Sequence, residues 1–298
     1  MHLRLSDEVA VAIEAKIPVV ALESTVISHG LPHPQNLETA SGLQRIVHNG
    51  GAIPATIAVF DGEFCVGLTQ DQIEHLALGK NIRKISRRDL SIAVAHRLTC
   101  ATTVAATAFI AHRANIRVFA TGGIGGVHRG AGTDVSADLV ELSKTPITVV
   151  CSGPKIVLDL PATREWLETF GITVLGWQCD EMPAFYSRTS GLAVDERIDS
   201  ANEVAEIIRA RDDLGLSNAI LVTVPVPENS AIDPIELEAI LNESLTLADQ
   251  QKIKGKDVTP FLLAELSRRS NGRTLASNIA LLENNARVAA EIATAIAG

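Results

Sequence analysis

Short apolar runs that alternate with helical segments constrain the fold of this chain more than any other feature of its sequence. Strand-length runs rich in Val, Ile, Ala and Leu occupy residues 18–23, 55–60, 117–121, 148–151, 171–177 and 218–226. Near-continuous apolar strands are typical of a parallel sheet that helices cover on both faces. From about residue 233 onward the pattern is helical. We therefore predict an α/β fold, namely a three-layer α/β/α sandwich with a largely parallel central sheet and a helical C-terminal region.

The composition favours one aliphatic core. Hydrophobic residues make up 46% of the 298 residues and aromatic residues only 3%, so the core must be built mainly from Ala, Val, Ile and Leu. This length permits one large domain or two small ones. The sequence shows no low-complexity linker, charge block or fixed-period repeat that would mark a boundary. We predict a single domain that spans residues 1–298.

The charge balance and the sequence of the N-terminal segment limit the expected partners. A net charge of −9 argues against a nucleic-acid-binding protein, although a few local cations and a helix N-terminus can still hold a phosphate group. We find no signal-peptide pattern at the N-terminus and no run of about 18 apolar residues, so we expect a cytoplasmic protein without membrane association. The four cysteines form no CxxC pair, which predicts buried free thiols and no structural zinc site.

A glycine-rich run from Thr121 to Gly130 follows the apolar run 117–121, where open α/β sheets place their ligands. Glycines let the backbone approach a ligand closely. The run is not a P-loop, because no Lys-Ser/Thr pair follows its last glycine. It is not a dinucleotide fingerprint, because His128 replaces the third glycine of GxGxxG. The run indicates a loop that contacts a ligand, with a plain flexible turn as the alternative.

Lys155 follows the apolar run 148–151 and the turn Ser152-Gly153-Pro154. Proline suits the first position of a helix, so we predict that Lys155 begins a short helix. The helix dipole and burial would both favour an uncharged amine there. A neutral lysine amine can attack an aldehyde-like carbon and form a Schiff base. The alternative is a solvated surface charge.

Three carboxylates are candidates for proton transfer or metal binding. Glu23 closes the apolar run 18–23, where a partly desolvated carboxyl group could exchange protons with a substrate or could simply accept bonds from loop amides. Asp134 and Asp138 would share a face if they were helical, and with Ser136 they could hold Mn²⁺ or Mg²⁺. Helix capping by Asp134 or Ser136 is the alternative.

A small basic cluster is a candidate phosphate site. Lys84, Arg87 and Arg88 lie close together in the sequence, and a helix N-terminus is predicted at Thr102-Thr103. Cations and exposed helix amides together can bind a phosphate group. A solvated basic face is the alternative.

Two histidines have the spacing of a helical metal pair, His29 and His33. Pro32 and Pro34 exclude the helix that this spacing requires, and we predict that residues 24–34 are irregular. We therefore discount both histidines as metal ligands.

Several stretches, in order and over nearly the whole chain, resemble the pseudouridine-5′-phosphate glycosidase family, also called the indigoidine-synthase-A-like family. They are ALESTVISHGLPHPQN (21–36), GAIPATIAV (51–59), KISRRDL (84–90), ATTVAAT (101–107), FATGGIGGVHRGA (119–131), DVSADL (134–139), CSGPKIVLDL (151–160), PAFYSRTSGL (183–192) and TPFLLAEL (259–266). The resemblance implies an α/β/α fold, a homotrimer and a pseudouridylate synthase or glycosidase, classed among the carbon–oxygen hydro-lyases. Residues 129–134 form a shorter loop than is usual in the family.

The resemblance also assigns roles to individual residues. Lys155 matches the family's Schiff-base lysine, Glu23 its proton-transferring glutamate and Asp134 its manganese ligand. The positions that match substrate contacts, or that fall in motifs lining the same pocket, are Lys84, Val104, Thr121, His128, Ser136, Ala137, Asp138 and Asn278. The implied cofactor is Mn²⁺, with Mg²⁺ or another divalent cation as the alternative.

The implied activity is the reversible cleavage of the C–C glycosidic bond of pseudouridine 5′-phosphate to uracil and ribose 5-phosphate, through a lysine Schiff base, in nucleotide catabolism. One alternative is a Schiff-base lyase that acts on another sugar phosphate or C-glycoside. Another is a non-catalytic accessory protein that binds such a ligand. Only an enzyme would form an imine at Lys155 that borohydride can trap.

Overall fold

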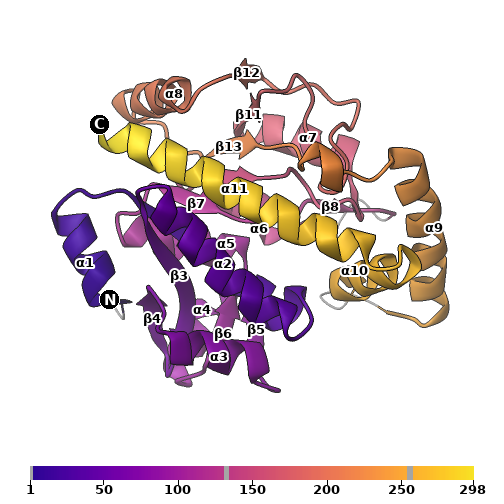
Figure 1. Ribbon diagram of the computed structural model, residues 1–298, viewed down its shortest axis with the longest axis horizontal. Helices are drawn as coiled ribbons and strands as arrows, with labels where there is room; N and C mark the ends of the chain where they lie inside the picture. The colour runs from indigo at the N-terminus through magenta and orange to yellow at the C-terminus, as the bar shows by residue number, and fades with distance from the viewer. Residues whose placement is uncertain (1–2, 131–133, 254–257) are drawn as a thin grey trace.

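A mostly parallel sheet forms the centre of the molecule in the computed structural model, which describes residues 3–130, 134–253 and 258–298 (Figure 1). The strands of the main sheet lie in the order β1-β4-β3-β2-β7-β9-β13-β11-β12, and β6 and β5 extend it from β3. β8 and β10 pair as a separate two-stranded sheet. The strands are β1 (Leu3–Leu5), β2 (Val19–Leu22), β3 (Ile53–Phe60), β4 (Glu63–Val66), β5 (Arg83–Ile85), β6 (Cys100–Thr102), β7 (Val118–Ala120), β8 (Val127–His128), β9 (Thr148–Cys151), β10 (Leu158–Asp159), β11 (Thr173–Trp177), β12 (Glu196–Ile198) and β13 (Ile220–Thr223).

The three strands at the middle of this sheet are parallel neighbours. Phe119 of β7 lies between Ala21 of β2 and Val149 of β9. Every residue of the three strands is buried, as their aliphatic sequences predict. Because parallel strands end at the same edge of a sheet, the residues that follow β2, β7 and β9 meet at one edge.

Helices cover both faces of the sheet, which confirms the predicted α/β/α sandwich. On one face α2 and α8 flank the long α11, which lies across β2, β7 and β9 (Figure 1). On the other face α1, α5, α6 and α7 share a second aliphatic core. The helices are α1 (Asp7–Glu14), α2 (Gln35–Asn49), α3 (Gln70–Leu78), α4 (Leu90–Ala95), α5 (Val104–Arg113), α6 (Ala137–Leu142), α7 (Leu160–Thr169), α8 (Ala201–Asp213), α9 (Pro234–Gln250), α10 (Val258–Arg269) and α11 (Arg273–Ala297).

Local capping signals begin several of these helices. The Ser6 hydroxyl caps α1, and Thr69 and Gln72 form a capping box at the start of α3. The Ser200 hydroxyl accepts a bond from the Glu203 amide at the start of α8. These caps satisfy amide groups that have no partner inside the helix.

The prediction that residues 24–34 are irregular is wrong for Val26–Gly30, which form a single π-helical turn. The two prolines follow this turn and therefore limit its length without preventing it. Two side-chain bonds hold the turn in place. The Ser28 hydroxyl donates to the Leu76 carbonyl at 2.9 Å, and the Asn36 amide donates to the Ile27 carbonyl at 2.9 Å.

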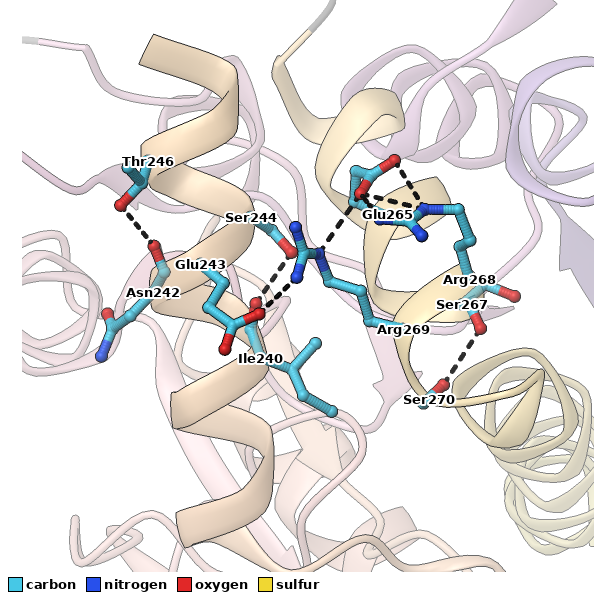
Figure 2. A network of polar contacts seen from close by, with 10 residues as sticks. All are labelled: Ile240, Asn242, Glu243, Ser244, Thr246, Glu265, Ser267, Arg268, Arg269 and Ser270. Atoms are coloured by element: carbon cyan, nitrogen blue, oxygen red, sulfur yellow. Dashed lines mark hydrogen bonds and ion pairs between the residues drawn. The ribbon is translucent and has the colours of Figure 1, made fainter. Parts of the chain in front are cut away.

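The helical C-terminal region is confirmed, and its first two helices are tied together by charge. Arg269 of α10 forms ion pairs with Glu243 of α9 and with Glu265 of its own helix, and Arg268 adds a further pair to Glu265 (Figure 2). The Arg269 side chain thus lies between two carboxylates from different helices. This network holds the C-terminal end of α10 against α9. The first turn of α10, at its other end, contributes Thr259 to the cavity described below.

Two further expectations concern the cysteines and the membrane. Cys65, Cys100 and Cys151 are buried free thiols as predicted, whereas Cys179 is partly exposed. In the described part of the chain, no helix combines the length and the apolar character needed to cross a membrane.

Candidate active site

A cavity of about 450 Å³ opens at the edge of the sheet where β2, β7 and β9 end. It brings together most residues that the sequence singled out. Those that line it are Glu23, Lys84, Val104, His128, Asp134, Ser136, Ala137, Asp138 and Lys155. A smaller cavity of about 60 Å³ adjoins it, shares Glu23, Lys84 and Lys155, and adds Asn278 of α11. Thr121 lines neither cavity and acts on the site through Glu23.

Glu23 is a buried ionisable group of the site. It follows β2 directly, is 9% exposed, and its Oε1 accepts a hydrogen bond from the Thr121 hydroxyl after β7. Burial raises the pKa of Glu23 above its ordinary value, whereas the positive charge of Lys155 and the Thr121 bond oppose the rise. A carboxyl group with a raised pKa remains protonated at a higher pH and can donate that proton to a substrate.

Lys155 occupies a turn and not the start of a helix, so that part of the sequence prediction is wrong. The chain after β9 pairs instead with the glycine-rich run. The Lys155 amide donates to the Ile124 carbonyl at 3.1 Å, and the Ile124 amide donates to the Gly153 carbonyl at 3.1 Å. Gly153 has a φ of +78°, which turns the chain toward this pairing. The backbone of the run, and not a helix dipole, therefore positions the half-buried Lys155.

Cys151 is a second potential nucleophile close to Lys155, and its environment makes it inert. The residue is fully buried at the end of β9. Burial raises the pKa of the Cys151 thiol to about 12, so the thiolate that would be needed for attack is scarce. Lys155 is therefore the better candidate nucleophile of the two.

Asp134 and Asp138 do not share a helical face, which corrects the prediction made from their spacing. Asp134 precedes α6 and is exposed, while Asp138 is buried inside its first turn. The two Asp138 oxygens accept bonds from the Ala105 amide at 2.9 Å and the Gly125 amide at 2.8 Å. Ser136 caps α6, as the alternative reading of this segment proposed. Asp138 therefore joins the start of α5 to the glycine-rich run.

Gly125 packs so closely against this carboxylate that a larger residue does not fit. An added Cβ would lie 2.3 Å from the Ser136 hydroxyl and 2.8 Å from Asp138 Oδ2. We expect Gly125→Ala to lower the free energy of unfolding by about 1–3 kcal/mol through overpacking, measured by denaturant unfolding. Gly42→Ala is the control, because its Cβ would meet no atom closer than 3.9 Å and a helical alanine should stabilise α2. Equal stability of Gly125→Ala and the wild type would contradict this packing.

The three basic residues Lys84, Arg87 and Arg88 do not all line the cavity. Lys84 of β5 and Arg88 line the large cavity beside Thr103, the cap of α5. Arg87 is held elsewhere, because its guanidinium donates to both Glu141 oxygens at 2.7 Å and lies 4.3 Å from the centre of the Phe109 ring. Lys84, Arg88 and the N-terminus of α5 thus line the cavity together, and cations beside a helix N-terminus are groups that can bind an anion.

Some cavity residues have no role assigned from the sequence. Trp166 of α7 and Thr259 of α10 line the large cavity, and Phe185 lines the small one. Thr259 begins the stretch 259–266 and Phe185 lies in 183–192, so motif matching pointed to both segments without assigning either residue. His29 also lines the small cavity, whereas His33 is exposed.

The donor set tests whether the implied metal fits. Within residues 3–130, 134–253 and 258–298, no group of three or more His, Cys, Asp or Glu side chains is arranged to hold an ion. Asp134 is an exposed carboxylate at the cavity, and the Asp138 oxygens already accept backbone bonds. Asp134 is thus a single carboxylate that could hold a hard cation such as Mn²⁺ or Mg²⁺, and such an ion would keep most of its water. Residues 131–133 of the shortened loop lie outside the described residues.

The family model described as "Indigoidine synthase A like protein" matches residues 8–295. The chain belongs to this family. Curated relatives carry the name pseudouridine-5′-phosphate glycosidase. The relative from Caldanaerobacter subterraneus subsp. tengcongensis is 50% identical over 291 residues, which cover 97% of this chain and 95% of the relative. The relative from Staphylococcus aureus is 48% identical over 297 residues, with coverage of 99% and 97%.

Two solved structures share the fold over nearly the whole chain. The prealnumycin C-glycosynthase AlnA in complex with ribulose 5-phosphate has a TM-score of 0.92 and 41% identity, covering 99% of this chain and 97% of that one. An indigoidine synthase A-like protein from Thermotoga maritima has a TM-score of 0.92 and 37% identity, with coverage of 100% and 98%. The resemblance first seen in the sequence motifs is thereby confirmed.

Proposed function

We propose that this chain is an enzyme that reversibly cleaves the C–C glycosidic bond of pseudouridine 5′-phosphate to uracil and ribose 5-phosphate. The observation that carries the proposal is the meeting of Lys155 with the buried Glu23 in one cavity, beside Lys84 and Arg88. The names of relatives about half identical to this chain support the same activity. A lysine nucleophile, a proton donor and a phosphate site are the parts that this reaction requires.

The bond to be broken explains why a nucleophile is needed. A C–C glycoside gives its leaving group no oxygen lone pair to protonate, unlike the substrate of an ordinary glycosidase. In the proposed route, the Lys155 amine bonds to C1′ of the ribose while the bond from C1′ to the ring oxygen breaks. That oxygen takes its proton from Glu23. The ribose is then an open chain attached to the lysine nitrogen.

The second half of the route releases both products. The lysine nitrogen first gives one proton to the Glu23 carboxylate and so regains a lone pair. The bond between C1′ and C5 of uracil then breaks, its electron pair stays on the uracil carbon, and the proton held by Glu23 replaces the sugar there. The lysine nitrogen donates its lone pair to C1′ and forms an imine. Water hydrolyses this imine to the aldehyde of ribose 5-phosphate and frees the Lys155 amine. The sum is one water consumed for each bond cleaved.

The remaining site residues bind and orient the substrate. Lys84, Arg88 and the start of α5 hold the 5′-phosphate, so that binding energy places C1′ near Lys155. Asp134 would hold Mn²⁺, or Mg²⁺ in its place, and such an ion when bound polarises oxygens and orders water. His128, Ser136, Ala137 and Asn278 complete the walls. A homotrimer and a cytoplasmic location stay predictions from the sequence.

Removing Arg88 should weaken binding of the phosphate. We expect Arg88→Ala to reduce kcat/KM for pseudouridine 5′-phosphate by about 10–100-fold, because a charge-assisted hydrogen bond contributes about 1.5–3 kcal/mol. The loss should disappear when unphosphorylated pseudouridine is the substrate. Arg113→Ala is a matched control, since this exposed arginine lies at the far end of α5 beside Phe109. An equal loss with both substrates would show that Arg88 does not serve the phosphate.

The decisive experiment is to incubate the purified protein with pseudouridine 5′-phosphate and Mn²⁺ and to measure free uracil. Uracil and ribose 5-phosphate in equal amounts are expected, and the reverse reaction should form pseudouridine 5′-phosphate from the two. No uracil, with borohydride trapping of another sugar phosphate, would favour a Schiff-base lyase of different specificity. The structural likeness to a C-glycosynthase in complex with ribulose 5-phosphate makes that sugar phosphate the first to test.

A further inference from the structure

Asn285 of α11 is fully buried behind the site and lines neither of its cavities. Its side chain contacts two separate loops. The amide nitrogen donates to the Thr121 carbonyl at 2.8 Å and is 3.4 Å from the Gly122 carbonyl. The amide oxygen accepts a bond from the Ser152 hydroxyl at 3.2 Å. One side chain thus joins the chain after β7 to the chain after β9.

These two loops carry the groups that must cooperate. The first loop includes Thr121, whose hydroxyl holds the Glu23 carboxyl group. The second leads from Ser152 to Lys155, three residues later. The Ser152 amide also donates to the Gly122 carbonyl at 2.9 Å, so the loops already lie side by side where Asn285 enters. A shift of either loop would change the distance between the proton donor and the nucleophile.

The packing of α11 fixes the position of Asn285 relative to the two loops. Leu281 and Leu282, one turn earlier, are buried against Gly122, where an added Cβ would lie 3.3 Å from each side chain. Asn278, two turns earlier, lines the small cavity. On the side of α11 that faces the site, Asn278 lines a cavity, Leu281 and Leu282 pack against Gly122, and Asn285 bonds to the loops.

We propose that Asn285 is a positioning residue, which aligns Glu23 and Lys155 by joining the loops that carry Thr121 and Ser152. The expected effect on turnover rests on the proposed function. The expected effect on the order of the two loops rests on the hydrogen bonds alone. A buried amide that served stability alone would leave the turnover of the folded enzyme unchanged. An amide that aligns reacting groups affects kcat more than KM, because small misplacements slow the chemical step.

The experiment compares three variants of the full chain. Asn285→Ala removes the bonds to both loops, and Ser152→Ala removes only the bond to the loop of Lys155. Asn284→Ala is the matched control, because the neighbouring asparagine donates to the Pro225 carbonyl on another side of α11. We expect Asn285→Ala to lower kcat for uracil release on the order of 10²-fold with KM nearly unchanged. Ser152→Ala should lower kcat less, and Asn284→Ala should retain wild-type kcat.

Hydrogen exchange separates the proposal from the proposed function. In Asn285→Ala, the amides of residues 121–125 and of Ser152, Gly153 and Lys155 should exchange faster than in the wild type, and this should not occur in Asn284→Ala. Faster exchange in both loops of Asn285→Ala, together with a wild-type protein that releases no uracil, would preserve the loop alignment and reject the function. Unchanged exchange, or a folded Asn285→Ala enzyme with wild-type kcat, would overturn the positioning role.

Discussion

Lys155→Ala should abolish the release of uracil while leaving the fold intact. The substitution removes the amine that bonds to C1′, and losing a covalent nucleophile costs on the order of 10⁴–10⁶-fold in kcat. The fold should survive because the half-buried side chain is absent from the two main aliphatic cores. The measurements are steady-state uracil release, the thermal unfolding transition, and the mass of the protein after borohydride reduction with ribose 5-phosphate.

Lys144→Ala is the matched control, since this lysine is exposed and lies just beyond α6. It should retain normal turnover and should still be trapped on Lys155 by borohydride. Near-normal uracil release by Lys155→Ala would rule out the covalent route. A wild-type protein that is active but never trapped would do the same.

Glu23→Gln should lower kcat by about 10²–10⁴-fold, the usual contribution of general acid–base catalysis. Glutamine keeps the size of the side chain and can still accept the Thr121 bond, but it has no proton to give to the ring oxygen. Because the variant retains the cavity, its KM should change much less than its kcat. A variant with wild-type kcat would exclude Glu23 as the proton donor.

The pH dependence of the wild type offers a separate test of Glu23. Burial raises the pKa of this carboxyl group, so the protonated, active form persists above the pH at which an ordinary glutamate ionises. We therefore expect kcat to be retained below the raised pKa of Glu23 and to fall as the pH increases through it. The Glu23→Gln variant should lose this descending arm. An arm that persists in the variant would assign the titration to another group.

The sequence predicted the layers and the edge of the sheet because those features depend on local composition. Aliphatic runs such as Val19–Leu22 and Thr148–Cys151 can be buried in few ways, and parallel strands place Glu23 and the Lys155 loop at one edge. Capping residues such as Ser136 act within a few positions of themselves, so capping by Ser136 could be named from the sequence.

The errors arose where a distant partner decides the structure. Proline at position 154 suggested a helix, but the chain there pairs with Ile124 of the glycine-rich run. The spacing of Asp134 and Asp138 suggested a shared face, but backbone amides of Ala105 and Gly125 hold Asp138. The sequence placed Arg87 in a candidate phosphate site, but its guanidinium bonds to Glu141, which lies 54 residues away in the chain. Sequence patterns carry no signal for such long-range pairs.

The position of α11 in the chain has a consequence for how the enzyme is made. Glu23, Thr121 and Lys155 all precede α11 by more than a hundred residues, so a ribosome completes them well before it reaches Asn285. A domain generally folds as a unit. A nascent chain would therefore contain every reacting group while the two loops were still unaligned, and it would gain activity only when the final helix docks.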